Sequence, residues 1–342
     1  MMHSTMLSTA AALLLFTASI QGTVIKRAPA NCTATKDYPG FAKIKYLFSF
    51  GDSYTQTGFN ENDKQPSAEN PIGNPPFPGY TSSNNAPNWI GYLTASKNAS
   101  QLLTYNVASG GAMIDCTLVK PYAPTVVCVN DQVSKVWSKT YSSKPASAPW
   151  KSEDSVFLFW DGVNDVGNTW YMPEQERAAL WTKIFAVWRK QLDTLYDAGA
   201  RNFAFLNTPP VDRSPLALTN TPEQQKTEKD AVAVWNGNLT ELVKAFRKEK
   251  ADTNVFTVDT NEIFNKAMDT PTAFEETAGL KNTTGFCADY ANGTPKQDTL
   301  IPACGVAVNQ YFWLNNLHPT SAVHEVVAVS VAKALTDGPN VC

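Results

Sequence analysis

Four short polar segments carry side chains that, if the fold brought them together, could hydrolyse an ester. They are, in chain order, GDSY (51–54), NVASGGAM (106–113), DGVND (161–165) and LNNLHPT (314–320). A serine needs a base to become a nucleophile, and it needs fixed donors to hold the oxyanion that it creates. Ser53 is the candidate nucleophile. We also expect Ser53 to begin a helix, because a helix N-terminus favours the negative charge that develops there.

The histidines narrow the choice of base. The chain has three, and His3 lies in a segment that we expect to be cleaved. His324 falls inside a predicted helix, where a structural histidine is the commoner outcome, whereas His318 falls in a loop just before Pro319. Because a base must project into a site, the sequence favours His318 over His324.

The oxyanion donors come from the two middle segments. Gly110 and Gly111 allow close approach of the backbone to a substrate, and Asn164 offers a side-chain amide N–H. The backbone N–H of Ser53 points into the same space. Each of these segments alone is also a common turn sequence, so only their joint occurrence in this order indicates a site.

Motifs of competing chemistries are incomplete. No G-x-S-x-G occurs, and the H-E-x-x-H pattern that begins at His324 ends in Ala328 instead of a second histidine. The chain also has no P-loop and no G-x-G-x-x-G. The sequence therefore predicts no metal and no cofactor.

The four segments together resemble those of the SGNH, or GDSL-type, hydrolases. Within that superfamily, GDSYTQTGF and FWLNNLHPT are similar to segments of secreted fungal carbohydrate esterases of family sixteen, the acetylesterases of hemicellulose. The resemblance implies a flavodoxin-like three-layer αβα sandwich with a central parallel sheet and hydrolysis through an acyl-serine. It carries the nucleophile onto Ser53, the oxyanion donors onto Ser53, Gly110 and Asn164, and the base onto His318.

One position departs from the superfamily pattern. An aspartate usually stands three residues before the catalytic histidine, and this chain has Asn315 there. An amide oxygen can orient the imidazole but brings no full charge, and a flipped amide would enforce the wrong tautomer. We therefore expect a Ser53–His318 dyad in which Asn315 or a backbone carbonyl orients the ring.

Apolar runs and helical patterns alternate along the chain, which favours an α/β fold with a parallel sheet. Strands are predicted at Tyr46–Phe50, Ser155–Trp160, Asn202–Asn207 and Asn254–Asp259, and helices at Glu174–Ala198, at Pro222–Lys250 and from Ser321. The segment from Asn60 to Asn88 is too rich in proline for either element. It is either a lid or pocket wall, with Phe77 and Tyr80 as contacts, or a plain surface loop.

The amino-terminal residues resemble a secretory signal peptide. An apolar run from Ala10 to Ala18 is too short to cross a bilayer, and Lys26-Arg27 is either a processing site or an incidental dibasic pair. We expect 1–27 to be removed and 28–342 to form one SGNH hydrolase domain, with the net charge changing from −3 to −5. A mildly acidic chain without basic runs argues against nucleic-acid binding, and no membrane anchor is predicted. The product should be a secreted, extracellular monomer.

Six cysteines and five glycosylation sequons fit an exported protein. One pairing among the 15 that six cysteines allow joins Cys116 to Cys128, Cys287 to Cys304 and Cys32 to Cys342. The sequons lie at Asn31, Asn98, Asn238, Asn282 and Asn292.

The resemblance favours an oligosaccharide or small-molecule ester as substrate, with acetyl as the acyl group. Trp160, Trp170 and Trp313 are candidate sugar contacts, although a tryptophan beside a strand usually packs in the core. Asp52 is a further candidate contact, but Asp52 and Asp165 fit better as supports for their loops. Two alternatives remain open: a lipase or phospholipase acting on lipid esters, and a sugar-binding relative without catalysis.

Overall fold

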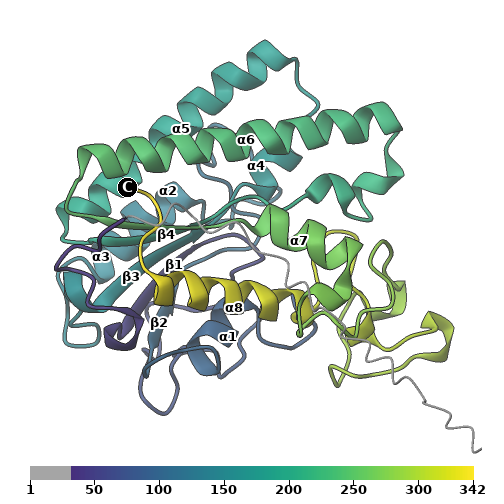
Figure 1. The fold of residues 1–342 in the computed structure, drawn as a ribbon, viewed down its shortest axis with the longest axis horizontal. Coiled ribbons are helices and arrows are strands. Elements are labelled where there is room, and N and C mark those ends of the chain that lie inside the picture. The colour runs from purple at the N-terminus through teal and green to yellow at the C-terminus, as the bar shows by residue number, and fades with distance from the viewer. Residues whose placement is uncertain (1–31) are drawn as a thin grey trace, which may run out of the picture. The chain divides into compact units, whose positions relative to one another are not determined.

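A five-stranded parallel sheet lies at the centre of residues 32–342, the part of the chain that the computed structural model describes (Figure 1). The strands lie in the order β2-β1-β3-β4-β5. Their bounds are Tyr46–Gly51 for β1, Leu103–Asn106 for β2, Ser155–Trp160 for β3, Asn202–Leu206 for β4 and Asn254–Val258 for β5. This order is flavodoxin-like, and in such sheets ligands bind at the carboxyl ends of the strands where the order reverses, here at β1 and β3.

The strand sequences explain why the sheet is parallel and covered. YLFSFG, SVFLFW and NFAFL are almost continuously apolar, and every residue of β1, β3 and β4 is buried. Strands that are buried on both faces show such runs instead of an alternation of polar and apolar residues. Stacked aromatic pairs between neighbouring strands, such as Phe50 with Phe159 and Phe159 with Phe205, continue this core across the sheet.

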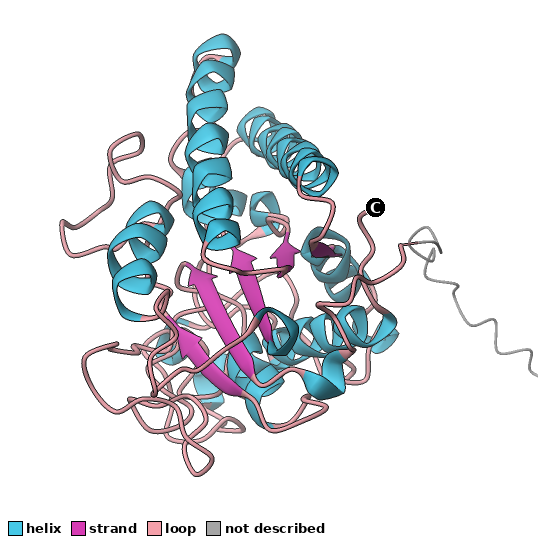
Figure 2. Cartoon of the chain, turned by 90° about the vertical axis from the view of Figure 1, so that its left-hand side faces the viewer, coloured by secondary structure: helices cyan, strands magenta, loops and turns pink. Residues whose placement is uncertain are grey.

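Helices cover both faces of the sheet, which gives the three-layer sandwich (Figures 1 and 2). The helices α5 and α6 lie on one face, together with the segment 129–140 that contains α2, a π-helical stretch and α3; α1, α7 and α8 lie on the other face. The bounds are Trp89–Ala95 for α1, Val129–Asp131 for α2, Gln132–Trp137 for the π-helix, Ser138–Thr140 for α3, Val163–Gly167 for α4, Glu174–Asp197 for α5, Pro222–Glu249 for α6, Thr260–Asp269 for α7 and Ser321–Asp337 for α8.

The long helices begin and end close to the predicted residues. The hydroxyl of Thr221 caps α6 by accepting the N–H of Gln224, and Gly199 follows the end of α5 with a φ of 108°. Thr320 precedes α8, but its hydroxyl donates to the carbonyl of Tyr311 and makes no cap bond. The helix is instead held by burial of its valine-rich face against the sheet.

Several shorter elements were missing from the sequence prediction, among them β2, α1, α4, α7 and the helical segment 129–140. The strand β2 is only four residues long, and α1 is buried over most of its surface, so neither shows a periodic pattern. The start of α7 did carry a pattern, because Asp259 caps the N–H of Glu262 and an acidic residue three positions after a cap is typical of helix starts.

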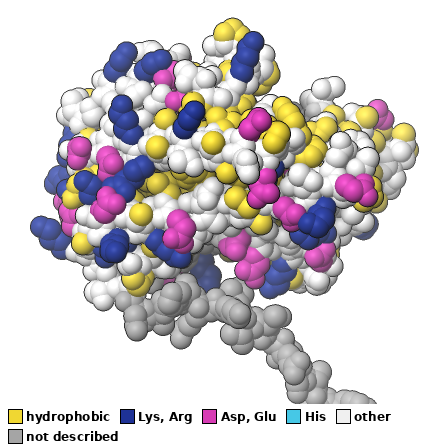
Figure 3. All heavy atoms as spheres, turned by 90° about the horizontal axis from the view of Figure 1, so that it is seen from above, with side chains coloured by type: hydrophobic (Ala, Val, Ile, Leu, Met, Phe, Trp, Pro, Cys, Tyr) yellow, Lys and Arg dark blue, Asp and Glu magenta, His cyan; other side chains and the backbone are white. Residues whose placement is uncertain are grey.

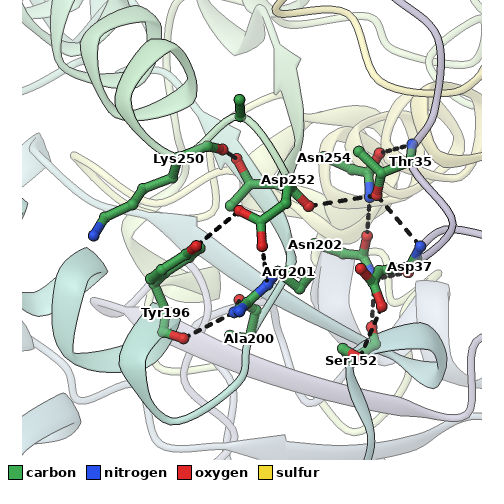
Figure 4. A network of polar contacts seen from close by, with 12 residues as sticks. Thr35, Asp37, Ser152, Tyr196, Ala200, Arg201, Asn202, Lys250, Asp252 and Asn254 are labelled. Atoms are coloured by element: carbon green, nitrogen blue, oxygen red, sulfur yellow. Dashed lines mark hydrogen bonds and ion pairs between the residues drawn. The ribbon is translucent and has the colours of Figure 1, made fainter.

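A network of hydrogen bonds and one ion pair lies at the amino ends of β4 and β5 (Figure 4). The four polar segments lie at the other end of the strands. The amide of Asn202 donates to three backbone carbonyls, and Asn254 bonds to Thr35 and Asn202. The nearby Arg201 forms an ion pair with Asp252 at 2.8 Å. These bonds attach the first described residues to the bottom of the sheet, where we assign them a structural role.

The cysteines form the pairs Cys32–Cys342, Cys116–Cys128 and Cys287–Cys304, which is the pairing favoured from sequence. The predicted signal segment 1–27 and the sequon at Asn31 lie outside the described residues. No helix in the described part of the chain is long and apolar enough to cross a membrane. On the face formed over α5 and α6, basic and acidic side chains are interspersed with apolar ones (Figure 3).

Candidate active site

The serine lies in a tight turn directly after β1. Gly51 ends the strand with a φ of 149°, and a Cβ there would lie 2.3 Å from the carbonyl oxygen of Trp160, so only glycine fits. Asp52 then organises the turn, because its carboxylate accepts the N–H of Tyr54 and its carbonyl accepts those of Thr55 and Gln56. The expected helix at Ser53 is therefore wrong: residues 52–56 form a turn, and no helix dipole acts on the serine.

His318 reaches this turn from the other end of the chain. Its Nε2 lies 2.8 Å from Ser53 Oγ, a distance that allows direct proton transfer. The loop that carries it is tied to the serine turn by a second contact, since the hydroxyl of Tyr54 donates to the carbonyl of Leu317. The imidazole also packs beside the ring of Tyr54, with 5.6 Å between ring centroids.

Asn315 faces the other nitrogen of the imidazole. Its Oδ1 lies 3.1 Å from His318 Nδ1 and also accepts the backbone N–H groups of Leu317 at 3.0 Å and of His318 at 2.8 Å. Because two backbone donors require an acceptor at this position, the amide must present its oxygen and not its nitrogen. The hydrogen of the ring consequently belongs on Nδ1, and the lone pair of Nε2 is directed at Ser53.

The environment of His318 favours the neutral ring. Burial lowers the pKa of His318 to about 4. An aspartate at 315 would counteract this effect by stabilising the imidazolium, but the amide of Asn315 carries no charge. At neutral pH the ring is therefore uncharged and available as a base.

The two segments that supply the candidate oxyanion donors, 106–113 and 161–165, are held together by hydrogen bonds beside Ser53. Asn164, on α4 after β3, donates from Nδ2 to the carbonyl of Ala112 at 2.9 Å and lies 3.4 Å from Asp52 Oδ2. The carboxylate of Asp165 accepts the N–H of Ile114 at 3.2 Å. Both hydrogens of the Asn164 amide therefore have an acceptor, and the longer bond, to Asp52, is the weaker one that a substrate oxygen could replace.

Three carboxyl groups, of Asp52, Asp161 and Asp165, are buried beneath these segments. Burial raises the pKa of Asp52 and of Asp165 to about 7. Burial and then repulsion from the other two carboxylates raise the pKa of Asp161 further above its ordinary value, and Asp161 Oδ2 has no hydrogen-bond partner in the described part of the chain. With only 1% of its surface exposed, Asp52 supports the turn and is not a substrate contact.

A pocket of about 440 Å³ opens over Ser53 and His318. Its walls include Gly110, Gly111 and Asn164, so the structure brings all four predicted segments to one cavity. The other wall residues are mostly polar: Gln56, Ser82, Ser109, Tyr122, Thr125, Val126 and Leu317. Gln56 lies in the quoted segment GDSYTQTGF but had no role assigned to it, whereas Tyr122 and Thr125 had no motif to mark them, because their positions depend on how the loops fold back over the site.

The proline-rich segment reaches the site through a residue that the sequence did not indicate. Ser82 lines the pocket and its hydroxyl donates to the carbonyl of Ser53 at 2.7 Å. Phe77 and Tyr80, the predicted contacts, are exposed side chains and are not among the pocket walls. The segment is therefore a pocket wall, but the two aromatic contacts were wrong.

Burial decides the roles of the remaining candidates. His324 is fully enclosed, and burial lowers its pKa to about 3, so it is a neutral core residue and not the base. Trp160 and Trp313 are each 1% exposed and pack in the core, which corrects their assignment as sugar contacts. Trp170 is only partly buried and lines a second pocket beside the first.

A serine, a histidine and an orienting amide at the switch point of an open parallel sheet are the parts that a serine hydrolase needs. The sequence profile of the GDSL-like Lipase/Acylhydrolase family matches residues 47–331, and the chain belongs to this family. It is accordingly a carboxylic ester hydrolase.

The chain is also similar to several named proteins. The chain is 40% identical over 291 residues to an acetylesterase of Thermothelomyces thermophilus, which covers 85% of this chain and 88% of the relative. It is 28% identical to the thermolabile hemolysin of Vibrio parahaemolyticus serotype O3:K6, over 84% of this chain and 62% of that protein. Among solved structures, Axe2, an acetylxylan esterase from Geobacillus stearothermophilus, aligns at 13% identity with a TM-score of 0.43, covering 86% of this chain and 96% of Axe2.

Proposed function

We propose that this protein is an extracellular esterase that removes acetyl groups from carbohydrates through an acyl intermediate on Ser53. The observation that carries the proposal is the line of contacts from Ser53 Oγ to His318 Nε2 at 2.8 Å and from His318 Nδ1 to Asn315 Oδ1 at 3.1 Å, inside one open pocket. The 40% identity to an acetylesterase supports the acetyl group. The carbohydrate rests on the resemblance of GDSYTQTGF and FWLNNLHPT to segments of carbohydrate esterases.

In the first step, Ser53 Oγ attacks the ester carbonyl carbon while its proton passes to His318 Nε2. The new Oγ–C bond places negative charge on the former carbonyl oxygen. The N–H groups of Ser53 and Gly110 receive this charge together with the Asn164 Nδ2 hydrogen that otherwise donates to Asp52, and each such donor contributes roughly 3 kcal/mol to lowering the barrier.

In the second step, the tetrahedral intermediate collapses and the C–O bond to the sugar breaks. The proton on His318 Nε2 passes to the departing alkoxide, which leaves as a free hydroxyl, and Ser53 keeps the acetyl group. A water molecule then repeats the sequence: His318 takes its proton, the oxygen attacks the acyl carbon, and acetate leaves as Ser53 recovers its hydrogen.

Asn315 acts in both steps by holding the ring. The imidazolium that forms has no carboxylate beside it, so its Nδ1–H is stabilised only by the dipole of an amide oxygen. Two backbone N–H groups fix that oxygen in place, which keeps the ring in the tautomer that the reaction needs.

Two further features support the proposed setting. Three disulfides are typical of proteins that mature outside the cytosol, which supports export. The side chains of Gln56, Ser82 and Thr125 on the pocket walls offer hydrogen-bonding groups to a hydroxyl-rich substrate. Lipid-ester hydrolysis and sugar binding without catalysis are the alternatives that the experiment must exclude.

The test compares p-nitrophenyl esters from acetate to palmitate with acetylated xylo-oligosaccharides. We expect release of acetate from the sugars and a steep fall in activity as the acyl chain lengthens. Ser53→Ala should abolish both activities, whereas Ser134→Ala, a change on the surface of the segment 129–140, should preserve them. Preference for palmitate would assign the protein to lipid esters, and full activity of Ser53→Ala would remove Ser53 as the nucleophile.

A further inference from the structure

A second cavity of about 220 Å³ adjoins the catalytic pocket. Asn164 and Leu317 line both cavities and so form the wall between them. On its far side the second cavity is bounded by α6 and by the loop that includes Ser214, Leu216 and Asn220. This loop is hydrogen-bonded to the histidine loop, residues 314–320, which carries His318: the N–H of Leu216 donates to the carbonyl of Asn316 at 2.8 Å.

A buried carboxyl group without a partner lines this cavity. Glu228 projects from α6 and is 6% exposed, and its Oε2 is enclosed without a hydrogen-bond partner in the described part of the chain. A buried carboxyl oxygen with no partner destabilises the protein that contains it, so a group at this place is explained if a ligand supplies the missing bond.

Protonation of Glu228 would let its carboxyl group donate a hydrogen bond as well as accept one. Burial, and then the negative charge of Asp212 nearby, raise the pKa of Glu228 to about 7. Below that pH the carboxyl group is neutral and offers one O–H donor besides its acceptor oxygen. Such a group can bind a hydroxyl, which both donates and accepts a hydrogen bond.

The rest of the cavity has the mixed lining that a sugar ring needs. Trp170, Val211 and Leu317 offer apolar surface to the C–H faces of a ring, while the amides of Asn168 and Asn220 offer polar groups at its edge. Pockets for drug-sized ligands are larger, about 300–1,000 Å³, so this cavity suits one ring and not a longer chain. An acyl chain would bury Glu228 against hydrocarbon, which is costly.

From these observations we propose that the cavity is a subsite for a sugar residue of the ester substrate, and that Glu228 recognises a ring hydroxyl there. The inference rests on the proposed carbohydrate esterase function and adds a specificity-determining residue to it. The shared wall of Asn164 and Leu317 places this ring next to the oxyanion donors and to the histidine loop.

The experiment measures kcat/KM for acetylated xylobiose and for p-nitrophenyl acetate, which has no sugar, and compares their ratio. In Glu228→Leu the ratio should fall about 10- to 100-fold, the loss expected for one hydrogen bond to a carboxyl group. Glu228→Gln keeps the shape of the side chain and one acceptor oxygen, so the ratio for this variant should lie much closer to the wild-type value. Glu241→Gln, an exposed change on the same helix, should leave the ratio at the wild-type value.

Thermal unfolding separates recognition from damage to the fold. Because Glu228 makes no bond that Leu would break, we expect Glu228→Leu to have a Tm equal to or above that of the wild type. A second probe is Gly167→Leu, since a Cβ at Gly167 meets no atom within 4 Å and the added side chain can enter the cavity. This variant should lower the ratio in the same way.

The outcomes distinguish the two proposals. If the wild type cleaves both substrates and Glu228→Leu keeps the wild-type ratio, the subsite is wrong and the proposed function stands. If the wild type cleaves only p-nitrophenyl acetate, the carbohydrate function is wrong and the subsite fails with it. Faster cleavage of long-chain esters by Glu228→Leu would also overturn the subsite, because the cavity would then be accepting acyl chains.

Discussion

Replacing Asn315 by aspartate should move the acidic limb of the pH–activity profile to higher pH. The carboxylate oxygen would lie where Asn315 Oδ1 lies now, 3.1 Å from His318 Nδ1. A unit charge at that distance gives roughly 5 kcal/mol at an effective dielectric constant of about 20, and opposite charges this close shift a pKa by about 1 to 3 units. The pKa of His318, held at about 4 by burial, should rise to roughly 5–7.

The sign follows from the role of the ring. A base must be unprotonated, so activity falls as the pH drops through the pKa of His318, and a higher pKa moves that fall to higher pH. The new carboxylate should stay ionised across this range, because the N–H groups of Leu317 and His318 and the Nδ1–H all donate to it.

The assay is kcat/KM for p-nitrophenyl acetate between pH 3 and 9, which reports groups of the free enzyme. Asn316→Asp is the matched control, because it adds the same charge one residue away on an exposed side chain, where solvent and salt screen it. An acidic limb that stays near pH 4 in a folded Asn315→Asp protein would refute the assignment of Asn315 as the residue that orients His318.

Three other changes test separate parts of the structure. Asn164→Ala should lower kcat by about 10²–10³ with little effect on KM, the loss typical of one oxyanion donor, and steady-state kinetics on p-nitrophenyl acetate will show whether KM changes instead. Asp161→Asn should raise Tm at pH 8 more than at pH 4. The raised pKa of Asp161 gives the wild type stability at low pH that it loses as the pH rises through that pKa, and a Tm difference independent of pH would contradict this reasoning. Replacing Cys32 and Cys342 together by serine should reduce the free energy of unfolding by about 2–5 kcal/mol. Activity should be kept, because Val341, next to Cys342, pairs with Val255 near the amino end of β5, away from the carboxyl ends of the strands where the site lies. Denaturant unfolding and the ester assay measure the two effects.

The central fold was accessible from sequence because its signals are local. Buried parallel strands appear as apolar runs, and α5 and α6 repeat apolar residues every three or four positions, so these elements were predicted to within one or two residues. The strand β2 and the helix α1 were missed because four residues carry little periodicity and a buried helix shows no polar face. The helix predicted at Ser53 failed because Asp52 closes a turn with its own carboxylate.

The site was predictable only as far as its residues carry motifs. Ser53, Gly110, Asn164 and His318 lie in recognisable segments, and the sheet brings those segments together. Glu228 lies in the second turn of α6, inside the polar run EQQKTEKD (223–230), and nothing in the sequence separates it from an exposed glutamate. Its importance depends on burial and on the lack of a partner, which are properties of the three-dimensional structure alone.

The neutral amide at 315 and the buried aspartates act in the same direction on how the protein responds to pH. Without a carboxylate beside it, His318 remains unprotonated down to about pH 4, so the base stays available in acid, although a base of low pKa is also a weaker proton acceptor. The carboxyl groups of Asp52 and Asp165, with pKa values of about 7, and that of Asp161 above its ordinary range stabilise the fold when protonated and lose that contribution as the pH rises. Both effects favour work on the acid side of neutrality. An aspartate at 315 would make His318 a stronger base. It would also leave His318 protonated, and so inactive as a base, at the acidic pH where the fold beneath it is most stable.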